Sequence, residues 1–453
     1  MNYDAIIIGS GQGGGPLARA LAKDGKSVAL IEKSHLGGTC INTGCTPTKT
    51  MLASAQVAHY VRNADRWGVR TSGMQVDLAA ILARKNKITG EFRRGQEKSA
   101  AGTKGMRVYR GVARFASAHV VRVGDETLES ANIFIDTGTR PSIPQIAGLE
   151  AAGYLTNETL MELTEVPEHL IVLGGGYIGL EFGQMFRRFG SRVTVIHHSG
   201  QILPREDREI AEALQKALEQ EGIEFVLNAK ATGVSGKIAV EYVLDGRTVS
   251  IAGSHLLVAT GRTPNVEDLD LAKAGVATDD RGFIKVNERL ETNVAGIWAM
   301  GDVNGGPAFT HISYNDYQIV YANLTSANQR TTAGRMVPYA VFTDPQLGGV
   351  GWTEKEAREK GYRLKIGKVE MTHVARAIER DETAGIMKIV VDASTDRILG
   401  ASILSSEGGE LVQILGTMML AGQPYTLLKD AIYIHPTLAE GFFALMDDVK
   451  AVG

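Results

Sequence analysis

The chain has 453 residues, a formal net charge of −3 and 22% charged residues. This length exceeds what one hydrophobic core usually serves, so we expect two or three domains. The small net charge provides no basic surface that would attract a nucleic acid or an anionic membrane. No apolar run approaches the length of a membrane span, and the first strand leaves no room for a signal peptide. We therefore expect a cytoplasmic protein that binds neither nucleic acid nor membrane.

A βαβ unit is predicted at the N-terminus. A short apolar run at residues 4–8 is followed by a glycine-rich turn, a helical stretch through Ala22 and a second apolar strand at residues 27–31. In such a unit the backbone of the turn approaches a pyrophosphate that lies at the helix N-terminus. Glu32 ends the second strand, where a carboxylate can accept hydrogen bonds from a ribose diol. The turn carries the three glycines of a dinucleotide-binding fingerprint, Gly9, Gly11 and Gly14.

The same pattern returns in the middle of the chain. An apolar run at residues 170–173 precedes a second fingerprint, a helix through about Arg188 and a strand at residues 192–196. His197 stands eighteen positions past the last fingerprint glycine, where the first unit has Glu32, and His198 follows it. Neither histidine has the fixed negative charge that repels a 2′-phosphate, so NADPH is favoured over NADH, although a neutral histidine can still hydrogen-bond a hydroxyl. The glycines of this fingerprint are Gly174, Gly176 and Gly179.

Three further segments have recognisable patterns. Residues 77–98 have helical spacing and predict a long, partly exposed helix. Residues 106–135 alternate in the manner of a small antiparallel sheet. After about residue 336 the glycine fingerprints stop, and short strands and amphipathic helices follow, which indicates a third domain.

The sequence holds only two cysteines, Cys40 and Cys45. Two are too few to brace a secreted scaffold or to form a four-ligand zinc site, so a catalytic pair is the economical interpretation. The sulfurs are close enough to bridge if the chain between them makes one helical turn. A helix N-terminus and the nearby Lys49 would favour thiolate. An inert buried pair is the alternative, and the polar setting rich in glycine and threonine argues against it.

Together these motifs resemble those of the class I pyridine nucleotide-disulfide oxidoreductases, the group that includes dihydrolipoamide dehydrogenase, glutathione reductase and mercuric reductase. Nearly the whole chain takes part in the resemblance. The segments that carry it are the first fingerprint with Glu32, residues 37–49 around the cysteines, the two Thr-Gly segments at 135–141 and 259–265, residues 297–303, residues 338–351 and residues 435–440.

The resemblance implies an α/β fold with two Rossmann-like dinucleotide-binding domains and a C-terminal α+β dimerisation domain. The FAD-binding domain would be discontinuous, at residues 1–146 and 264–335, with the NAD(P)-binding domain at 147–263 and the dimerisation domain at 336–453. Residues expected to bind FAD are Gly9, Gly11, Gly14, Glu32, Lys33, Gly38, Thr39, Lys49, Thr137, Gly138, Asp302, Ala308 and His311. Residues expected to bind NAD(P) are Gly174, Gly176, Tyr177, Ile178, Gly179, Glu181, His197, His198 and Gly261. No metal site is expected.

The family also implies a relay in which hydride passes from the nicotinamide to FAD and electrons leave through the disulfide. Cys45 would be the sulfur nearest the flavin and would form the charge-transfer thiolate. Cys40 would be the thiol that attacks the substrate. Lys49 would lie near the flavin and pair with Glu181, and Tyr177 would gate the nicotinamide pocket.

A histidine and a carboxylate near the C-terminus complete the implied active site. His435 and Glu440 match the family's catalytic pair, which the opposite subunit supplies to the disulfide. A histidine held by a carboxylate is suited to taking a proton from one thiol and returning it to a leaving thiolate. A homodimer with shared active sites follows, because a monomer would lack this pair.

The sequence indicates the substrate less clearly than it indicates the fold and the cofactors. Residues 42–50 resemble the mercuric reductase-like branch, whereas dihydrolipoamide dehydrogenases tend to have Val and Ile at the positions of Thr43 and Thr46. Typical mercuric reductases end in a cysteine pair, and residues 447–453 contain none. We expect reduction of a small disulfide or a thiol-bound substrate, with dihydrolipoamide dehydrogenase as the alternative enzyme. A redox sensor or complex subunit with little turnover is the alternative from another class, and the intact His435 favours turnover.

Overall fold

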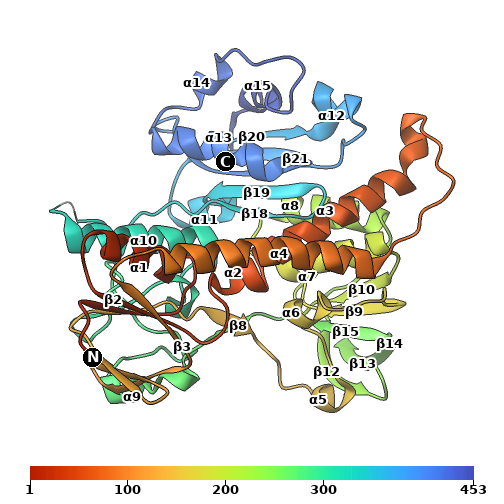
Figure 1. The fold of residues 1–453 in the computed structure, drawn as a ribbon. Coiled ribbons are helices and arrows are strands. Elements are labelled where there is room, and N and C mark those ends of the chain that lie inside the picture. The colour runs from red at the N-terminus through yellow and green to blue at the C-terminus, as the bar shows by residue number, and fades with distance from the viewer. Residues whose placement is uncertain (328, 453) are drawn as a thin grey trace.

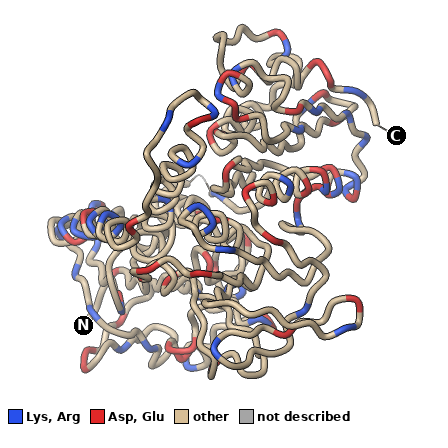
Figure 2. The backbone as a smooth tube through the Cα atoms, turned by 90° about the vertical axis from the view of Figure 1, so that its right-hand side faces the viewer, with Lys and Arg blue, Asp and Glu red and all other residues tan. Residues whose placement is uncertain are grey.

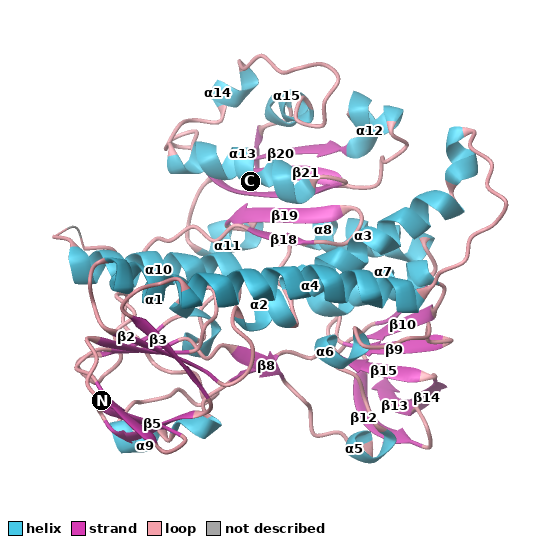
Figure 3. Cartoon of the chain, viewed as in Figure 1, coloured by secondary structure: helices cyan, strands magenta, loops and turns pink. Residues whose placement is uncertain are grey.

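The computed structural model describes residues 1–327 and 329–452, so that Asn328 and Gly453, the last residue of the third predicted domain, lie outside the described residues. Two nucleotide-binding units lie side by side below a layer of long helices, and the C-terminal domain lies above that layer (Figure 1). Helices and strands both occur in each of these three parts (Figure 3). Basic and acidic residues are interspersed along the backbone in Figure 2, in keeping with the small net charge.

The first unit is built on a five-stranded parallel sheet in the order β17-β7-β1-β2-β3. Strands β1 and β7 are buried along their whole length, because helices cover one face and a small sheet covers the other. The strands are β1 (Ala5–Ile8), β2 (Val28–Glu32), β3 (Met106–Arg110), β7 (Ile133–Ile135) and β17 (Ile297–Ala299).

The prediction that residues 106–135 form a small antiparallel sheet was wrong for the first and the last strand of that segment. Only β4 (Ala113–Ser117), β5 (Val120–Val123) and β6 (Glu126–Glu129) form an antiparallel sheet. Both β3 and β7 belong to the parallel sheet instead. The reason is that β3 lies at the sheet edge and alternates in burial there, and alternation does not show with which strand a segment pairs.

Helices of the first unit pack against this sheet and extend beyond it. Leu17 and Leu21 of α1 are buried against the strands. Asp77 caps the N-terminus of the long helix α4, because its side chain accepts a hydrogen bond from the backbone N–H of Ala80 at 2.9 Å. The long helix predicted at residues 77–98 is thereby confirmed. The helices are α1 (Gly14–Lys23), α2 (Gly38–Asn42), α3 (Cys45–Arg62), α4 (Leu78–Ala101), α9 (Leu271–Ala274) and α10 (Thr310–Thr325), with 3-10 turns η1 (Ala64–Trp67), η2 (Glu267–Leu269) and η3 (Gly301–Asn304).

The second unit repeats the same plan with a four-stranded parallel sheet, β11-β10-β9-β15, beside an antiparallel sheet, β12-β13-β14. Its strands are β9 (His169–Leu173), β10 (Arg192–Ile196), β11 (Ile223–Val226), β12 (Lys230–Ser235), β13 (Ala239–Leu244), β14 (Arg247–Ala252) and β15 (His255–Val258). Its helices are α5 (Leu149–Ala152), α6 (Asn157–Leu160), α7 (Tyr177–Phe189) and α8 (Arg208–Gln220). The chain crosses between the two units through an antiparallel pair, β8 (Thr139–Pro141) and β16 (Arg262–Pro264).

The C-terminal domain has a six-stranded antiparallel sheet in the order β18-β19-β22-β21-β20-β23, with α13 packed on β19 and β22. Its strands are β18 (Tyr339–Val341), β19 (Gln346–Gly351), β20 (Leu364–Glu370), β21 (Ile386–Asp392), β22 (Ile398–Ser405) and β23 (Lys450–Val452). Its helices are α11 (Glu354–Glu359), α12 (Ala375–Glu379), α13 (Gly408–Leu420), α14 (Thr426–Lys429) and α15 (Gly441–Asp447), with the turn η4 (Met371–His373). The predicted α/β class with two nucleotide units and a C-terminal α+β domain is therefore confirmed.

Buried ion pairs join the C-terminal domain to the second unit. The Lys388 side chain on β21 is 1% exposed, and its Nζ lies 2.7 Å from Asp207, 2.7 Å from Glu209 and 2.8 Å from Glu354. Asp207 and Glu209 belong to the start of α8 in the second unit, so one cation holds two domains together. In the part of the chain that the structure describes, no helix has both the length and the apolar character needed to cross a membrane.

Candidate active site

A cavity of about 550 Å³ runs between the two nucleotide units and past the N-terminus of α3. Sixteen of the predicted site residues line it: Gly9, Gly11, Glu32, Lys33, Gly38, Thr39, Cys40, Cys45, Lys49, Thr137, Gly138, Tyr177, Ile178, Glu181, Asp302 and Ala308. The other predicted residues lie outside its lining: Gly14, Gly174, Gly176, Gly179, His197, His198, Gly261, His311, His435 and Glu440.

Close backbone contacts explain the glycines of the first fingerprint. Gly9 has a φ of +101°, and a Cβ there would lie 2.2 Å from the carbonyl oxygen of Asp136. A Cβ on Gly14 would lie 2.2 Å from the carbonyl oxygen of Gly9. The turn therefore has no side chains in the way and brings the start of α1 to the cavity, the arrangement that binds a pyrophosphate. The shape and the N–H donors of this cradle fit a dinucleotide such as FAD.

The Glu32 carboxylate is held in place at the end of β2. Its Oε2 accepts hydrogen bonds from the Ser10 N–H at 3.1 Å and from the Ser10 hydroxyl at 2.6 Å. Its Oε1 accepts a hydrogen bond from the Ser34 N–H at 2.8 Å. Because a carboxylate has room for about four donors, Glu32 keeps accepting capacity toward the cavity that it lines.

Both cysteines are free thiols, so the structure shows the dithiol form of the pair. Cys40 lies in α2, and Cys45 begins α3 after a short turn at Thr43 and Gly44. The Cys45 Sγ lies 3.1 Å from the Thr310 hydroxyl. A hydrogen bond from the Cys40 thiol, together with the Thr310 hydroxyl and the Lys49 charge, lowers the pKa of Cys45 to about 6. The same hydrogen bond, together with burial, raises the pKa of Cys40.

Thr310 is a site residue that the sequence reasoning missed. It begins α10, and 265 positions separate it from the cysteine that it contacts. The available signal was its place at the start of a helix shortly after the Asp302 motif, which by itself does not indicate contact with a thiol. Its hydroxyl can donate a hydrogen bond to a thiolate, a charge-assisted contact that favours the ionised form.

Lys49 and Glu181 form an ion pair beside the cysteines. The Lys49 Nζ lies 2.6 Å from the Glu181 Oε2, and the Glu181 side chain is only 5% exposed. The other oxygen of Glu181 accepts a hydrogen bond from the backbone N–H of Phe342 at 2.9 Å, and the Lys49 Nζ lies 4.4 Å from the centre of the Phe342 ring. The pair therefore links α3, α7 and the residue that follows strand β18 at the start of the C-terminal domain.

Aromatic rings line up between the cavity and the C-terminal domain. The ring centroids of Tyr177 and Phe309 are 6.1 Å apart, and those of Phe309 and Tyr339 are 6.0 Å apart. Burial raises the pKa of Tyr177, so its hydroxyl stays uncharged at neutral pH. His311 does not reach the cavity, because its Nε2 contacts the backbone oxygen of Pro338 at 2.6 Å.

The two histidines that follow β10 in the second unit, His197 and His198, differ in exposure. His197 is buried, and its Nδ1 accepts a hydrogen bond from the Gly175 N–H at 3.1 Å. Burial lowers the pKa of His197 to about 4, so this ring is neutral at pH 7. His198 is exposed beside it, with ring centroids 4.7 Å apart. Only His198 is therefore free to meet the ribose end of a nucleotide from solvent.

His435 and Glu440 form a pair on the surface of the C-terminal domain. The His435 Nδ1 lies 2.9 Å from the Glu440 Oε2, and the histidine side chain is 73% exposed. Neither residue lines the cavity of its own chain. The Glu440 carboxylate thus orients the His435 ring, and the ring is accessible from outside the chain. A group that is presented to a second subunit needs both properties.

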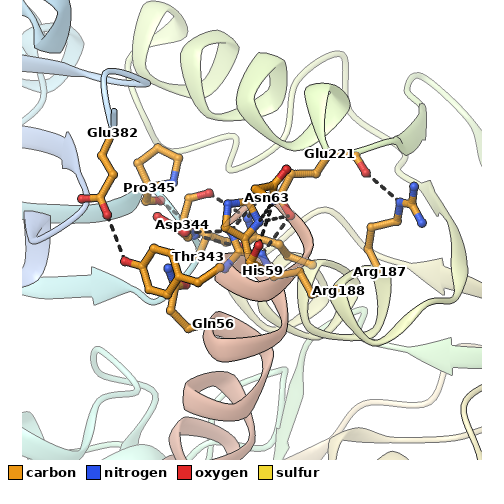
Figure 4. Close-up of polar contacts among 12 residues, drawn as sticks. Gln56, His59, Asn63, Arg187, Arg188, Glu221, Thr343, Asp344, Pro345 and Glu382 are labelled. Atoms are coloured by element: carbon orange, nitrogen blue, oxygen red, sulfur yellow. Dashed lines mark hydrogen bonds and ion pairs between the residues drawn. The ribbon is translucent and has the colours of Figure 1, made fainter. Parts of the chain in front are cut away.

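A polar network anchors the far end of the helix that begins at Cys45. Arg188 of α7, whose side chain is 4% exposed, lies 2.6 Å from Glu221 and 2.7 Å from Asp344. Its Nη1 also donates a hydrogen bond to the Gln56 side chain on α3 at 2.5 Å. Figure 4 shows these side chains pointing toward one another around the end of α3, where His59 joins them. No group of three or more His, Cys, Asp or Glu side chains suited to a metal ion occurs among the described residues.

Comparison with known proteins gives one consistent result. Residues 3–316 match the family described as pyridine nucleotide-disulphide oxidoreductase, and residues 337–445 match its dimerisation domain. A probable pyridine nucleotide-disulfide oxidoreductase of Escherichia coli K12, RclA, is 39% identical over 99% of this chain and 99% of its own length. A mercuric reductase of Lysinibacillus sphaericus is 37% identical over 97% of this chain and 81% of its own length. A dihydrolipoyl dehydrogenase of Thermus scotoductus is 35% identical over 99% of this chain and 97% of its own length.

Solved structures agree with these relatives. The structure of the HOCl-induced flavoprotein disulfide reductase RclA from Escherichia coli matches with a TM-score of 0.90 and 38% identity. The match covers 99% of this chain and 100% of that one. A Cu(II) complex of the same protein matches equally well, with a TM-score of 0.90.

Proposed function

The chain belongs to the pyridine nucleotide-disulphide oxidoreductase family, and we propose that it carries electrons from NADPH through FAD and the Cys40–Cys45 pair to a small disulfide or a thiol-bound substrate. As a member it is an oxidoreductase that uses FAD and NAD(P)H and forms a homodimer through its dimerisation domain. The observation that best supports the proposed route is the unequal pair of thiols at the cavity, with the pKa of Cys45 lowered to about 6. A dithiol with one thiolate already formed is the reactive state for disulfide exchange.

The residues at the cavity divide the work. FAD, when bound, supplies the transfer of a hydride equivalent between the nicotinamide and the disulfide. The Lys49 and Glu181 pair holds α3 and α7 together and places a positive charge near the thiols. We assign the gating of the nicotinamide pocket to Tyr177, because its ring lines the cavity at the start of α7.

The exchange itself proceeds in two steps. The Cys40 sulfur, deprotonated by His435 of a second copy, attacks a substrate disulfide and releases one substrate thiolate, which takes up that proton. The Cys45 thiolate then attacks the Cys40 sulfur, which reforms the protein disulfide and releases the second substrate thiolate. One substrate disulfide becomes one thiol and one thiolate, the thiolate takes its proton from solvent, and the protein dithiol becomes a disulfide.

NADPH is the proposed donor because the acid that favours an unphosphorylated ribose is absent from the end of β10. His197 is neutral and turned toward the glycine turn, so we assign recognition of the 2′-phosphate to the exposed His198 rather than to His197. Comparing kcat/KM for NADPH and NADH in the wild-type enzyme and in His198→Glu tests this assignment. The new carboxylate should shift the ratio toward NADH, and an unchanged ratio would remove His198 from the site.

Steady-state assays decide the substrate class. NADPH oxidation should be measured with lipoamide, oxidised glutathione, coenzyme A disulfide, Hg(II) and Cu(II), the metals being included because a mercuric reductase and a Cu(II) complex are among the relatives. We expect turnover with a disulfide or with a thiolate complex of a metal ion. Preference for lipoamide with NADH would instead favour dihydrolipoamide dehydrogenase. If every disulfide and metal complex failed while a quinone or oxygen was reduced rapidly, the proposed substrate class would be wrong.

A redox sensor with little turnover is the second candidate. It is favoured by the same pair of cysteines, since an accessible low-pKa thiolate is also what a sensor needs. Turnover that stays very slow with every acceptor, together with rapid oxidation of the dithiol, would select the redox sensor.

A cytoplasmic location is part of the proposed disulfide reductase function, because a disulfide that cycles needs a reducing compartment.

A further inference from the structure

A buried carboxyl group lies at the N-terminus of α1, where the proposed FAD site would hold the pyrophosphate. Asp136 follows β7, lines the cavity and is buried. Its Oδ2 accepts hydrogen bonds from the backbone N–H groups of Gly14 at 2.6 Å and Gly13 at 3.2 Å. These N–H groups open α1, where the helix end favours negative charge and where a dinucleotide places its pyrophosphate. A carboxylate and a pyrophosphate at the same helix end would repel each other.

The second nucleotide unit of the same chain supplies an internal comparison. A Cβ on Gly9 would lie 2.2 Å from the Asp136 carbonyl oxygen, and a Cβ on Gly174 would lie 2.3 Å from the Ala259 carbonyl oxygen. The two backbones therefore have the same register at this point, and Ala259 is the counterpart of Asp136. A methyl group fills this position in the second unit, so the fold does not require a carboxyl there. The carboxyl is a feature of the FAD side.

The surroundings of Asp136 oppose its ionisation. Burial raises the pKa of Asp136 most, and two acidic groups, Asp302 on η3 and Asp316 on α10, raise it further. Each of them has its own cation: Arg262 lies 3.9 Å from Asp302, and Arg335 pairs with Asp316. Among the described residues no cation is recorded in contact with Asp136. Burial, the largest cause, and these two charges raise the pKa of Asp136 to about 8, although the Gly14 and Gly13 N–H groups act in the other direction.

The proton has a definite place on this carboxyl group. Oδ2 is already used as an acceptor by two backbone N–H groups. Oδ1 accepts only one long hydrogen bond, from the Ser313 hydroxyl at 3.4 Å, so it is the oxygen with more room for the proton. A protonated Oδ1 is a hydrogen-bond donor, and a phosphate oxygen is an acceptor, so the neutral acid turns a repulsive contact into an attractive one.

We propose that Asp136 enters the FAD site as a neutral carboxylic acid that donates a hydrogen bond to the pyrophosphate, so that loss of its proton weakens FAD binding. Bound phosphates add negative charge and make ionisation harder still, so the complex keeps the proton to higher pH than the empty site does. Above the pKa of the empty site, FAD binding then requires uptake of one proton. The dissociation constant for FAD rises by about tenfold per pH unit in that range.

FAD release from dilute holoenzyme tests this proposal. The protein is kept in its disulfide form so that Cys45 does not titrate, and free flavin is separated by ultrafiltration and measured by fluorescence from pH 6.5 to pH 9. We expect the dissociation constant of wild-type enzyme to stay constant up to neutral pH and then to rise by about tenfold by pH 9. In Asp136→Asn, which keeps an uncharged hydrogen-bonding group, the dissociation constant should stay near the wild-type value at pH 7 and should not rise with pH.

Two outcomes would overturn the proposal. A wild-type dissociation constant that does not change over this pH range would show that Asp136 does not change charge, whether or not the variant folds. FAD bound at least tenfold more tightly by Asp136→Asn than by wild type at pH 7 would show that the native group is a repulsive carboxylate. Asp125→Asn is the matched control, because it makes the same substitution at an exposed aspartate outside the cavity and should keep the wild-type pH dependence. The readout is cofactor release, so it does not depend on which substrate the enzyme reduces.

Discussion

The proposed reactivity of this protein depends on two thiols that differ only in their surroundings. Cys45 receives a hydrogen bond from Cys40 and lies 3.1 Å from the Thr310 hydroxyl, whereas Cys40 is the donor of the pair. Charge is therefore directed to one sulfur before any substrate arrives. This asymmetry agrees with the proposed division of work, in which Cys45 serves the flavin and Cys40 serves the substrate.

The pH dependence of the reduced enzyme follows from this asymmetry. The pKa of Cys45 is lowered to about 6, so its thiolate is present at neutral pH and is lost as pH falls through about 6. We expect the two-electron-reduced enzyme to show a long-wavelength thiolate-to-flavin absorption band with that midpoint. Cys45→Ser should abolish the band, and Cys40→Ser should keep it. A band that persists in Cys45→Ser would assign the flavin contact to the other sulfur.

Thr310 should set the position of that midpoint. A hydrogen bond to a charged group contributes about 1.5–3 kcal/mol, which corresponds to about 1–2 pH units. Thr310→Val removes the hydroxyl at constant shape, so we expect the midpoint of the band to rise by about 1 pH unit. Thr310→Ser keeps the hydroxyl and should titrate as the wild type does. Equal midpoints in the valine and serine variants would show that Thr310 does not act on the thiolate.

At the scale of elements, the position of the proposed redox pair depends on how α3 is held. The helix begins at Cys45, and Lys49 in its first turns is paired with Glu181 of α7. Near its other end, Gln56 is joined to Arg188, which also holds Glu221 and Asp344. Two polar anchors, one at each end, therefore fix this helix against α7 and the C-terminal domain.

Removing the second anchor should cost stability. Arg188→Ala leaves two partly buried carboxylates without their cation, a change that typically costs about 3–5 kcal/mol. We expect that loss in the free energy of unfolding, measured by chemical denaturation with FAD bound. Arg192→Ala is the control, since Arg192 and Glu224 are 58% and 49% exposed and such surface pairs contribute less than about 1 kcal/mol. Similar losses in the two variants would mean that the network does not anchor α3.

At the scale of the whole molecule, one chain cannot complete the proposed active site. His435 is 73% exposed and lies outside the cavity that holds the cysteines of its own chain. The family match identifies residues 337–445 as a dimerisation domain. In a two-fold dimer the same surface of each copy meets the other, so both histidines would reach the opposite cavity by symmetry.

Mixed dimers test this sharing. In a dimer of one Cys45→Ser chain and one His435→Ala chain, one shared site loses both groups and the other keeps both. Random exchange of the two inactive variants should therefore restore about a quarter of the wild-type disulfide reductase activity per site. Neither parent should show it, and flavin reduction by NADPH should survive in His435→Ala. Activity that stays at the level of the parents after confirmed exchange would place the whole active site within one chain.

Local signals in the sequence were enough for the main architecture. Two glycine fingerprints, each between a strand and a helix, predict the two nucleotide units. In each turn the backbone must pass close to its neighbours without a Cβ, and the glycines that allow this lie within a few positions of one another. The spacing of Cys40 and Cys45 likewise indicated a redox pair. The pairing of β3 and β7 could not be predicted, since alternation in a segment does not depend on which strand it meets.

The sequence by itself determined the fold class and the family and indicated the proposed redox pair, because each is encoded in short motifs. Only the tertiary structure decided which groups surround those motifs. Thr310 is 265 positions from Cys45, and Asp136 is 122 positions from Gly14. The charge on a buried carboxyl or thiol depends on burial and on neighbours within a few ångströms, and chain folding alone brings such distant residues together.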